Sequence, residues 1–213
     1  SVYNENQSLP LKETSKVGNT KNPYGTTKYI IEKILIDLAN YDDRWSIRIA
    51  RYCNPISNHS SGQIQENPKG IPGNLIPHII KVAQKKLSRL KVYGKNYPTK
   101  DGTCIRDYIH VTDLVHAHFL AFNKLIYENG FFDFNLGNGN GFSVLEIIKA
   151  CESISKKSVN YKFVSKRIGE PEYLVADSSK AISELKWKIV YSDIYEIIKT
   201  AWRWHNRLYS EII

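Results

Sequence analysis

Tyr24 and Lys28 are two side chains four residues apart that together could move a proton. Pro23 fixes the backbone just before them, and apolar residues at helical spacing follow, which predicts a helix up to about Asn40. Residues four apart lie on one face of a helix, so the ammonium would stand beside the phenol. Its positive charge favours the phenolate, and a phenolate can accept the proton of an alcohol. The spacing therefore predicts a general base.

The alternative is a helix that carries a tyrosine and a lysine at this spacing by chance, and the neighbouring elements help to decide. A strand rich in β-branched and aromatic residues follows at 45–52. A helix followed by a strand is typical of an α/β fold with a parallel sheet, in which helices and strands alternate. Further strands are predicted at 90–93, 108–111, 131–136 and 159–164, and further helices at 74–86 and beginning near residues 112, 143, 177 and 193.

The composition places limits on the class of protein. The 213 residues are 42% hydrophobic and 24% charged, which is typical of a soluble globular protein. No apolar run has the length of a membrane span, and no signal segment opens the chain. Cys53, Cys104 and Cys151 have no metal or redox spacing, which indicates reduced thiols in the cytoplasm and no metal centre.

The net charge of +9 would attract phosphorylated molecules. The basic residues are scattered and come without the aromatic motifs of nucleic-acid binding, so we expect a solvated basic face and no nucleic-acid partner. Phosphorylated small molecules remain the class of partner that the charge favours.

Several segments carry a resemblance to a known family. They run in order through nearly the whole chain: Asn22-Pro23-Tyr24-Gly25 with Lys28, Arg51-Tyr52-Cys53-Asn54-Pro55, Gly70-Ile71-Pro72-Gly73-Asn74-Leu75-Ile76-Pro77, Asp101-Gly102-Thr103-Cys104-Ile105-Arg106-Asp107-Tyr108-Ile109-His110-Val111, Asn135-Leu136-Gly137 and Arg167-Ile168-Gly169-Glu170. On these segments the chain resembles the UDP-glucose 4-epimerases of the extended short-chain dehydrogenase/reductase family.

The resemblance implies C4 epimerisation, the interconversion of UDP-glucose and UDP-galactose in galactose metabolism, through a 4-keto sugar and a bound NAD. Tyr24 would take the proton of the 4-hydroxyl, and Lys28 would hold the NAD ribose and favour the phenolate. Tyr52 would line the nicotinamide pocket, with a buried core tyrosine as the alternative. A homodimer through the Tyr24 helix is also implied.

The resemblance further implies a UDP site. Asn54 and Asn74 would contact UDP with their amides, next to Leu75, although each asparagine could instead serve turn chemistry. Lys91, Val92 and Tyr93 form the strand that would face uracil, with a core position as the alternative for Val92.

Charged residues of the later segments complete the implied site. Arg106 and Arg167 would clamp the pyrophosphate through their planar guanidinium groups, with ordinary surface arginines as the alternative. Glu170 would hold the uridine ribose. Leu174 would leave room for an N-acetyl group, so N-acetylated sugars join the expected substrates.

Two features of the family are missing from the sequence. No glycine-rich turn for the NAD pyrophosphate follows a first strand, and the catalytic serine would precede Ser1. We therefore expect a C-terminal portion, inactive alone, of a Rossmann-type parallel sheet plus a smaller mixed α/β substrate-binding domain. Residues 1–55 would end the NAD-binding domain and 56–213 would bind the UDP-sugar, with 101–145 returning to the Rossmann sheet. A non-catalytic sugar-nucleotide binder and a nucleotide-sugar dehydratase are the alternatives.

Overall fold

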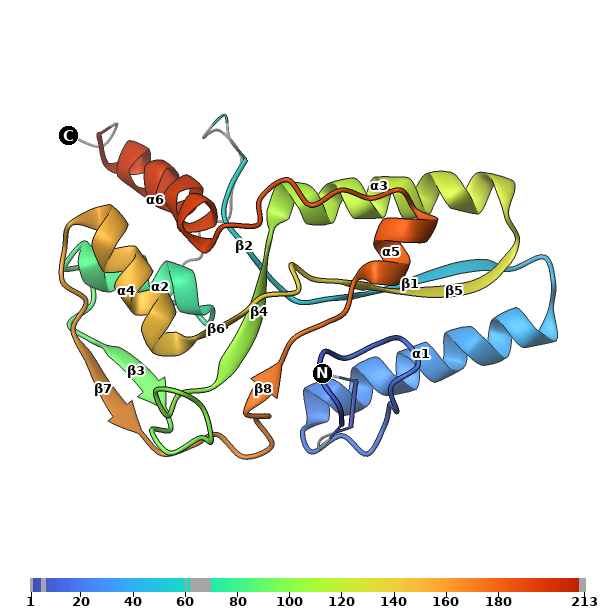
Figure 1. Cartoon of the computed structure of the whole chain (residues 1–213), viewed down its shortest axis with the longest axis horizontal. Coiled ribbons are helices and arrows are strands. Elements are labelled where there is room, and N and C mark those ends of the chain that lie inside the picture. Colours follow the sequence, from blue (N-terminus) through green and yellow to red (C-terminus); the bar gives the residue numbers. More distant parts are fainter. Residues whose placement is uncertain (1, 5–6, 60, 62–69, 211–213) are drawn as a thin grey trace.

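The computed structural model describes residues 2–4, 7–59, 61 and 70–210, and the side chains of these residues up to Asn206. Figure 1 shows a mixed α/β arrangement of these elements. In chain order they are α1 (Pro23–Tyr41), β1 (Ser46–Tyr52), β2 (Asn54–Ile56), α2 (Leu75–Ala83), β3 (Leu90–Tyr93), β4 (Ile105–His110), α3 (Val111–Tyr127), β5 (Gly130–Leu136), β6 (Gly141–Ser143), α4 (Val144–Ser155), β7 (Tyr161–Val164), β8 (Tyr173–Leu174), α5 (Ser179–Glu184) and α6 (Ile194–Ser210).

Helix α1 begins where the sequence predicts. Asn22 has extended backbone angles and its side-chain oxygen accepts a hydrogen bond from the Gly25 amide at 2.8 Å. Pro23 occupies the first helical position, where its missing N–H costs nothing. Cap and proline together fix the start of the helix, and so the place of Tyr24 in its first turn.

Strands β1 and β5 form the sheet that supports α1. They pair in parallel over their full lengths, from Ser46 opposite Gly130 to Tyr52 opposite Leu136. Helix α1 and helix α3 lie on opposite sides of this pair (Figure 1). A parallel pair with helices on both faces is the α/β arrangement that the sequence predicts.

The remaining strands form two further groups. In one, β4 pairs with β2 and β8 in parallel and with β6 in antiparallel orientation. In the other, β3 pairs with β7 in parallel. A hydrophobic core joins β3 to helices α2, α4 and α6, and a second core surrounds the buried Trp187 next to β5 and α3.

The predicted elements are confirmed within a few residues, including the Ser143–Glu146 capping box of α4. The short strands β2, β6 and β8 were not predicted, because two or three residues carry no measurable periodicity. The division into domains stays a prediction, and the pairing of β5 with β1 is consistent with the return of 101–145 to the first sheet.

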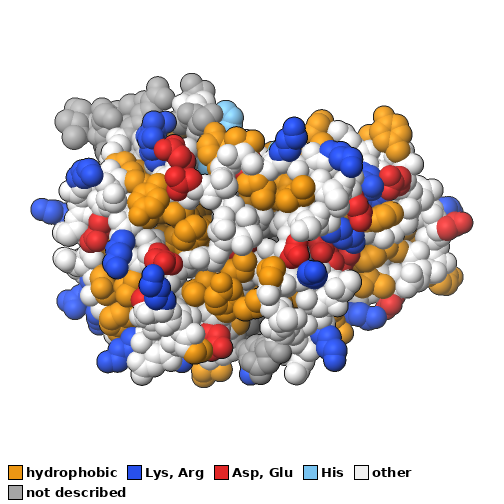
Figure 2. All heavy atoms as spheres, viewed as in Figure 1, with side chains coloured by type: hydrophobic (Ala, Val, Ile, Leu, Met, Phe, Trp, Pro, Cys, Tyr) orange, Lys and Arg blue, Asp and Glu red, His pale blue; other side chains and the backbone are white. Residues whose placement is uncertain are grey.

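The surface agrees with the expectation of scattered charge. Lys and Arg side chains are spread over the face in Figure 2 and mixed with acidic and hydrophobic ones. Within the described residues, no helix has the length and apolar character to cross a membrane.

Candidate active site

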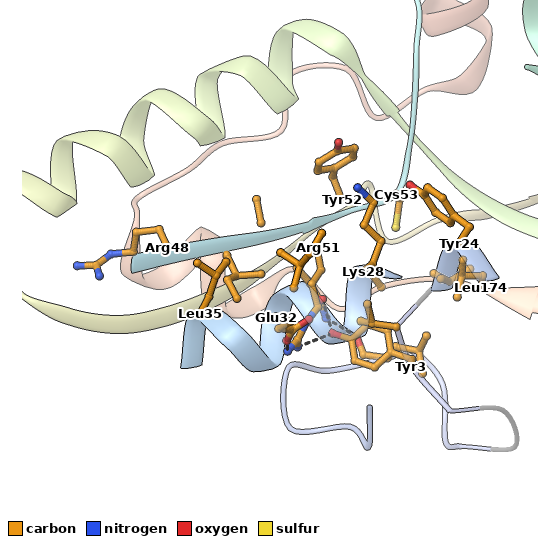
Figure 3. A pocket seen from close by; sticks show the side chains of 18 residues that line it. Tyr3, Tyr24, Lys28, Glu32, Leu35, Arg48, Arg51, Tyr52, Cys53 and Leu174 are labelled. Atoms are coloured by element: carbon orange, nitrogen blue, oxygen red, sulfur yellow. Dashed lines mark hydrogen bonds and ion pairs between the residues drawn. The ribbon is translucent and has the colours of Figure 1, made fainter. Parts of the chain in front are cut away.

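A cavity of about 290 Å³ lies between α1, β1 and the segment that follows β8 (Figure 3). Tyr24 and Lys28 reach it from α1, Tyr52 and Cys53 from the end of β1, and Leu174 from β8. Because β1 is a parallel strand, this wall lies at the carboxyl end of the sheet, where open α/β sheets bind ligands.

Tyr24 and Lys28 are both available at this cavity. The Tyr24 side chain is 64% exposed, and the Lys28 ammonium lies 5.4 Å from the centre of its ring. Among the residues that the structure describes, no carboxylate lies within ion-pair distance of the Lys28 ammonium. The pair therefore has the arrangement that the sequence predicts for a base and its cation.

A second phenol lines the same cavity and has a different environment. The Tyr3 hydroxyl donates a hydrogen bond to the Asn135 side-chain oxygen at 2.5 Å and accepts one from Arg51 at 3.1 Å. Burial raises the pKa of Tyr3 to about 12, against the opposing effect of Arg51. Tyr3 therefore stays protonated near neutral pH and is not a candidate base.

Arg51 lies at the floor of this cavity in a buried ion network. Its guanidinium pairs with the Glu32 carboxylate on α1 and, at 3.0 Å, with the Asp133 carboxylate on β5. Only 9% of the Arg51 side chain and 5% of that of Glu32 are exposed. The network therefore connects the helix that carries Tyr24 to both strands beneath it.

A second cavity, of about 710 Å³, adjoins the first. Four residues line both cavities: Tyr3, Leu11, Tyr24 and Leu174. The lining of the second cavity is cationic, with four basic side chains (Lys21, Arg106, Lys166 and Arg167) against two carboxylates (Glu170 and Glu172). Such a lining suits an anionic ligand, and phosphate oxygens are the ligands that arginine binds best.

Glu170 holds the two arginines of this cavity in place. One of its carboxylate oxygens lies 3.3 Å from the Arg106 guanidinium and 4.0 Å from that of Arg167. Its other oxygen is buried and has no hydrogen-bond partner among the described residues. Arg167 also lies over the ring of Tyr93, with 3.9 Å between guanidinium carbon and ring centre. Because this oxygen is buried, a ligand hydroxyl would reach it only if the Glu170 side chain moves.

Comparison with known proteins adds to this geometry. The profile of the NAD dependent epimerase/dehydratase family matches residues 1–137. The chain belongs to this family.

The chain is similar to individual members over almost its whole length. It is 45% identical to a UDP-glucose 4-epimerase of Bacillus subtilis over 96% of its residues, and 45% identical to one of Drosophila melanogaster over 97%. It spans 60% and 59% of the length of these two relatives. It also superposes, with a TM-score of 0.92 and 42% identity, on a crystal structure of a UDP-glucose 4-epimerase from Bifidobacterium longum in complex with NAD⁺ and UDP, covering 97% of this chain and 61% of that one.

The structure brings most of the predicted site residues to the two cavities. Tyr24, Lys28 and Tyr52 line the smaller one, Arg106, Arg167 and Glu170 the larger one, and Leu174 both. Tyr52 is 55% exposed with its ring 5.9 Å from that of His118, so the alternative of a buried core tyrosine does not hold.

The other predicted residues lie away from both cavities. The Asn54 side chain donates to the backbone oxygen of Asp107, and Asn74 stands at the N-cap position of α2, before Leu75. Val92 is buried in the core between β3 and α2, which was the alternative for this residue, while its neighbour Lys91 is exposed. Their contact with a ligand stays a prediction.

Sequence reasoning overlooked several residues of the site. Lys21 and Lys166 are part of the cationic lining, and each adjoins a recognised segment, so proximity was a usable signal. Glu32 and Asp133 gave no signal, because their partner Arg51 lies on a different element and only the fold brings the three together.

The residues around the smaller cavity fit the nicotinamide and its ribose, one end of the dinucleotide that the family name implies. Lys28 offers an ammonium without an acidic partner among the described residues, and such a donor suits a pair of ribose hydroxyls. The exposed ring of Tyr52 on the same wall suits a planar nicotinamide.

Proposed function

We propose that this chain provides the general base and the sugar-nucleotide site of a UDP-glucose 4-epimerase, which interconverts UDP-glucose and UDP-galactose in galactose metabolism. One observation carries the proposal. Tyr24 lines two cavities. One also contains Lys28 and Tyr52, and the other is the cationic cavity of Arg106 and Arg167. A base at the junction of two cavities can act on a sugar held between a cofactor and a nucleotide.

The proposed chemistry is a reversible proton transfer at the sugar 4-hydroxyl. The Tyr24 phenolate accepts the proton, and the resulting phenol returns it after the 4-keto sugar has presented its other face. Lys28 stabilises the phenolate through its charge. Bound NAD supplies the acceptor and donor for the 4-hydride, and Lys28 and Tyr52 would hold it.

The cationic cavity is the proposed place of the UDP moiety. Arg106 and Arg167 would bind the two phosphates, and their pairing with Glu170 keeps both guanidinium groups facing the cavity. The free oxygen of Glu170 would accept a hydrogen bond from a ribose hydroxyl once its side chain has moved. Asn54, Asn74, Leu75, Lys91, Val92 and Tyr93 complete the predicted substrate residues, of which Tyr93 contacts Arg167 directly.

The test compares binding and turnover. Calorimetry would measure UDP binding to the 213-residue chain, and a coupled assay would follow UDP-galactose turnover with NAD by the native protein. We expect micromolar UDP binding in the first and epimerisation in the second. Binding without epimerisation would indicate a non-catalytic sugar-nucleotide binder. Release of water to a stable 4-keto product would indicate a dehydratase, and a failure of both binding and turnover would refute the proposal.

We further propose that N-acetylated UDP-sugars are accepted. Leu174 lines both cavities at the side where the sugar would sit, and it is shorter than an aromatic residue. The Leu174→Tyr variant should lose turnover of the N-acetyl substrate at least tenfold relative to UDP-galactose, since a clash acts only on the larger ligand. Turnover of UDP-galactose alone by the unmodified protein would contradict this.

We also propose a cytoplasmic homodimer that forms through α1. The helix exposes Ile30, Ile31 and Ile34 to at least half of their area, and its last residue Tyr41 to 89%. The three free thiols, Cys53, Cys104 and Cys151, suit a reducing compartment. Light scattering of the native protein and of an Ile34→Glu variant would test the dimer, which the variant should dissociate.

A further inference from the structure

We propose that Arg51 is a positioning residue, which holds the Glu32 carboxylate and so keeps the Lys28 ammonium free to act beside Tyr24. The proposal rests on the proposed function, because it concerns the base of that reaction. It assigns a role to a residue that touches neither the phenol of Tyr24 nor the ammonium of Lys28 in the described structure.

Glu32 is the carboxylate best placed to pair with Lys28. Tyr24, Lys28 and Glu32 follow one another at intervals of four residues, so they share one face of α1. Oppositely charged residues at this interval on a helix attract each other. All three side chains line the smaller cavity. Without a competing partner, the Glu32 carboxylate would be drawn to Lys28.

Arg51 is that competing partner. Its guanidinium makes a two-pronged contact with the Glu32 carboxylate, from Nε at 3.2 Å and from the second terminal nitrogen. Bidentate pairing of this kind fixes the carboxylate in direction as well as in place. In Figure 3 the Lys28 side chain points toward Tyr52, while Glu32 points toward Arg51 and Tyr3.

The charges of the network balance without Lys28. Arg51 and Lys180 are the two cations, and Glu32 and Asp133 are the two anions, with 3.0 Å between Lys180 and Asp133. Arg51 also donates to the Tyr3 hydroxyl, so the second phenol of the cavity is fixed by the same group. Arg48, the other basic side chain of the cavity lining, donates to the backbone oxygens of Ile47, Gly130 and Glu128. Lys28 is therefore the cation of this lining that remains for a ligand and for Tyr24.

Loss of Arg51 would leave the Glu32 carboxylate buried and without its partner. Removing one partner of a buried ion pair is strongly destabilising, because it leaves an uncompensated charge. Lys28 lies one turn away on the same face of α1, so we expect the Glu32 carboxylate to pair with it. The ammonium would then lie beside the carboxylate and away from Tyr24.

The test uses the native protein with three changes. Arg51→Met removes the guanidinium, and Arg51→Met with Glu32→Met removes the whole pair, which keeps the net charge unchanged and avoids an unpaired buried carboxylate. Lys180→Met is the matched control, because it removes a cation of the same network that does not contact Glu32.

Two readouts separate positioning from folding. The labelling rate of the Lys28 amine by an amine-reactive ester, read by peptide mass spectrometry, should fall about tenfold in Arg51→Met, as expected for an ion pair of about 1.4 kcal/mol. The kcat for UDP-galactose should fall in the same variant, because the ammonium no longer stands beside Tyr24. Both should return to the parent values in the double variant and stay unchanged in Lys180→Met.

The outcomes decide the proposal in either direction. Unchanged Lys28 labelling in a folded Arg51→Met protein would overturn it, as would a double variant that remains as slow as the single one. If Arg51→Met does not fold, Arg51→Lys carries the test, because a lysine keeps the charge but loses the two-pronged contact with Glu32. Lys28 labelling should fall in this variant by less than tenfold, and a labelling rate equal to that of the parent would overturn the proposal. The labelling needs no turnover, so an inactive parent protein would reject the proposed function and leave this inference open to the same measurement.

Discussion

Tyr24 and Tyr3 are phenols on the wall of one cavity, and their surroundings give them different chemistry. Tyr3 is held between Arg51 and Asn135 and is kept protonated by burial. Tyr24 is exposed beside an ammonium. Residue type alone does not distinguish them, whereas their contacts do.

The first prediction at the residue scale concerns Tyr24. Tyr24→Phe should lower turnover by about 10²- to 10⁴-fold, the usual contribution of a general base, while UDP binding stays within a factor of two. Steady-state kinetics and calorimetry of the native protein would check this. The matched control is Tyr41→Phe, which changes another exposed tyrosine of the same helix outside both cavities. Equal losses in the two variants would argue against Tyr24 as the base.

A second residue-scale prediction concerns the cationic cavity. Arg167→Gln should weaken UDP binding by about 10- to 100-fold, since a hydrogen bond to a charged group contributes about 1.5–3 kcal/mol. Calorimetry at two salt concentrations would measure it, and the salt dependence should also fall. Arg203→Gln, an exposed position on α6, is the control. Retained affinity in Arg167→Gln would place the phosphates elsewhere.

At the scale of elements, Asn22 connects helix α1, which carries Tyr24, to the loop that carries Arg167. Its side-chain oxygen caps α1, and its side-chain nitrogen lies 3.4 Å from the Gly169 carbonyl. Gly169 has a positive φ of 69°, and a Cβ there would lie 2.8 Å from the Lys21 oxygen. Close approach of the two segments therefore requires a glycine at this point.

The prediction for this element is a cap effect. Asn22→Ala should lower the free energy of unfolding by about 1 kcal/mol, because the Gly25 amide loses its acceptor. Asn22→Asp keeps the acceptor and should retain most of the stability. Urea unfolding of both variants would measure the difference. Similar losses in Ala and Asp would show that the cap contributes little and that the contact to Gly169 matters more.

At the scale of the whole molecule, His110 joins the central strands to the C-terminal segment. It ends β4, its Nδ1 accepts from the Thr112 amide to cap α3, and its ring stacks on Tyr191 with 3.9 Å between ring centres. Its Nε2 lies 3.2 Å from the Thr200 hydroxyl on α6. Burial lowers the pKa of His110 to about 4, and burial lowers the pKa of His205 to about 4 as well.

These pKa values predict how stability depends on pH. In the unfolded chain these histidines have a pKa of about 6.5, so below that pH they bind protons in the unfolded state but not in the folded state. The free energy of unfolding is therefore highest above pH 6.5 and falls as the pH drops toward 4. The loss for His110 should be on the order of a few kcal/mol. Urea unfolding at pH 7 and pH 5 would measure it. His110→Asn should make the free energy of unfolding less dependent on pH, whereas His116→Gln, at an exposed position, should leave the dependence unchanged.

The sequence by itself determined the elements that depend on neighbours along the chain. The Asn22–Pro23 start of α1, the Ser143–Glu146 capping box and the apolar strands are local patterns, and the structure reproduces them. The Tyr24–Lys28 pair belongs to the same group, because the helical repeat alone places the two side chains together.

Only the tertiary structure decided which distant groups meet. Arg51 pairs with residues 19 positions before it and 82 positions after it, and no periodicity links these positions. The junction of the two cavities at Tyr24 has the same origin, since β8 and the segment near Tyr3 reach it from opposite ends of the chain. Such contacts depend on how strands pair and helices pack, and these are properties of the whole fold.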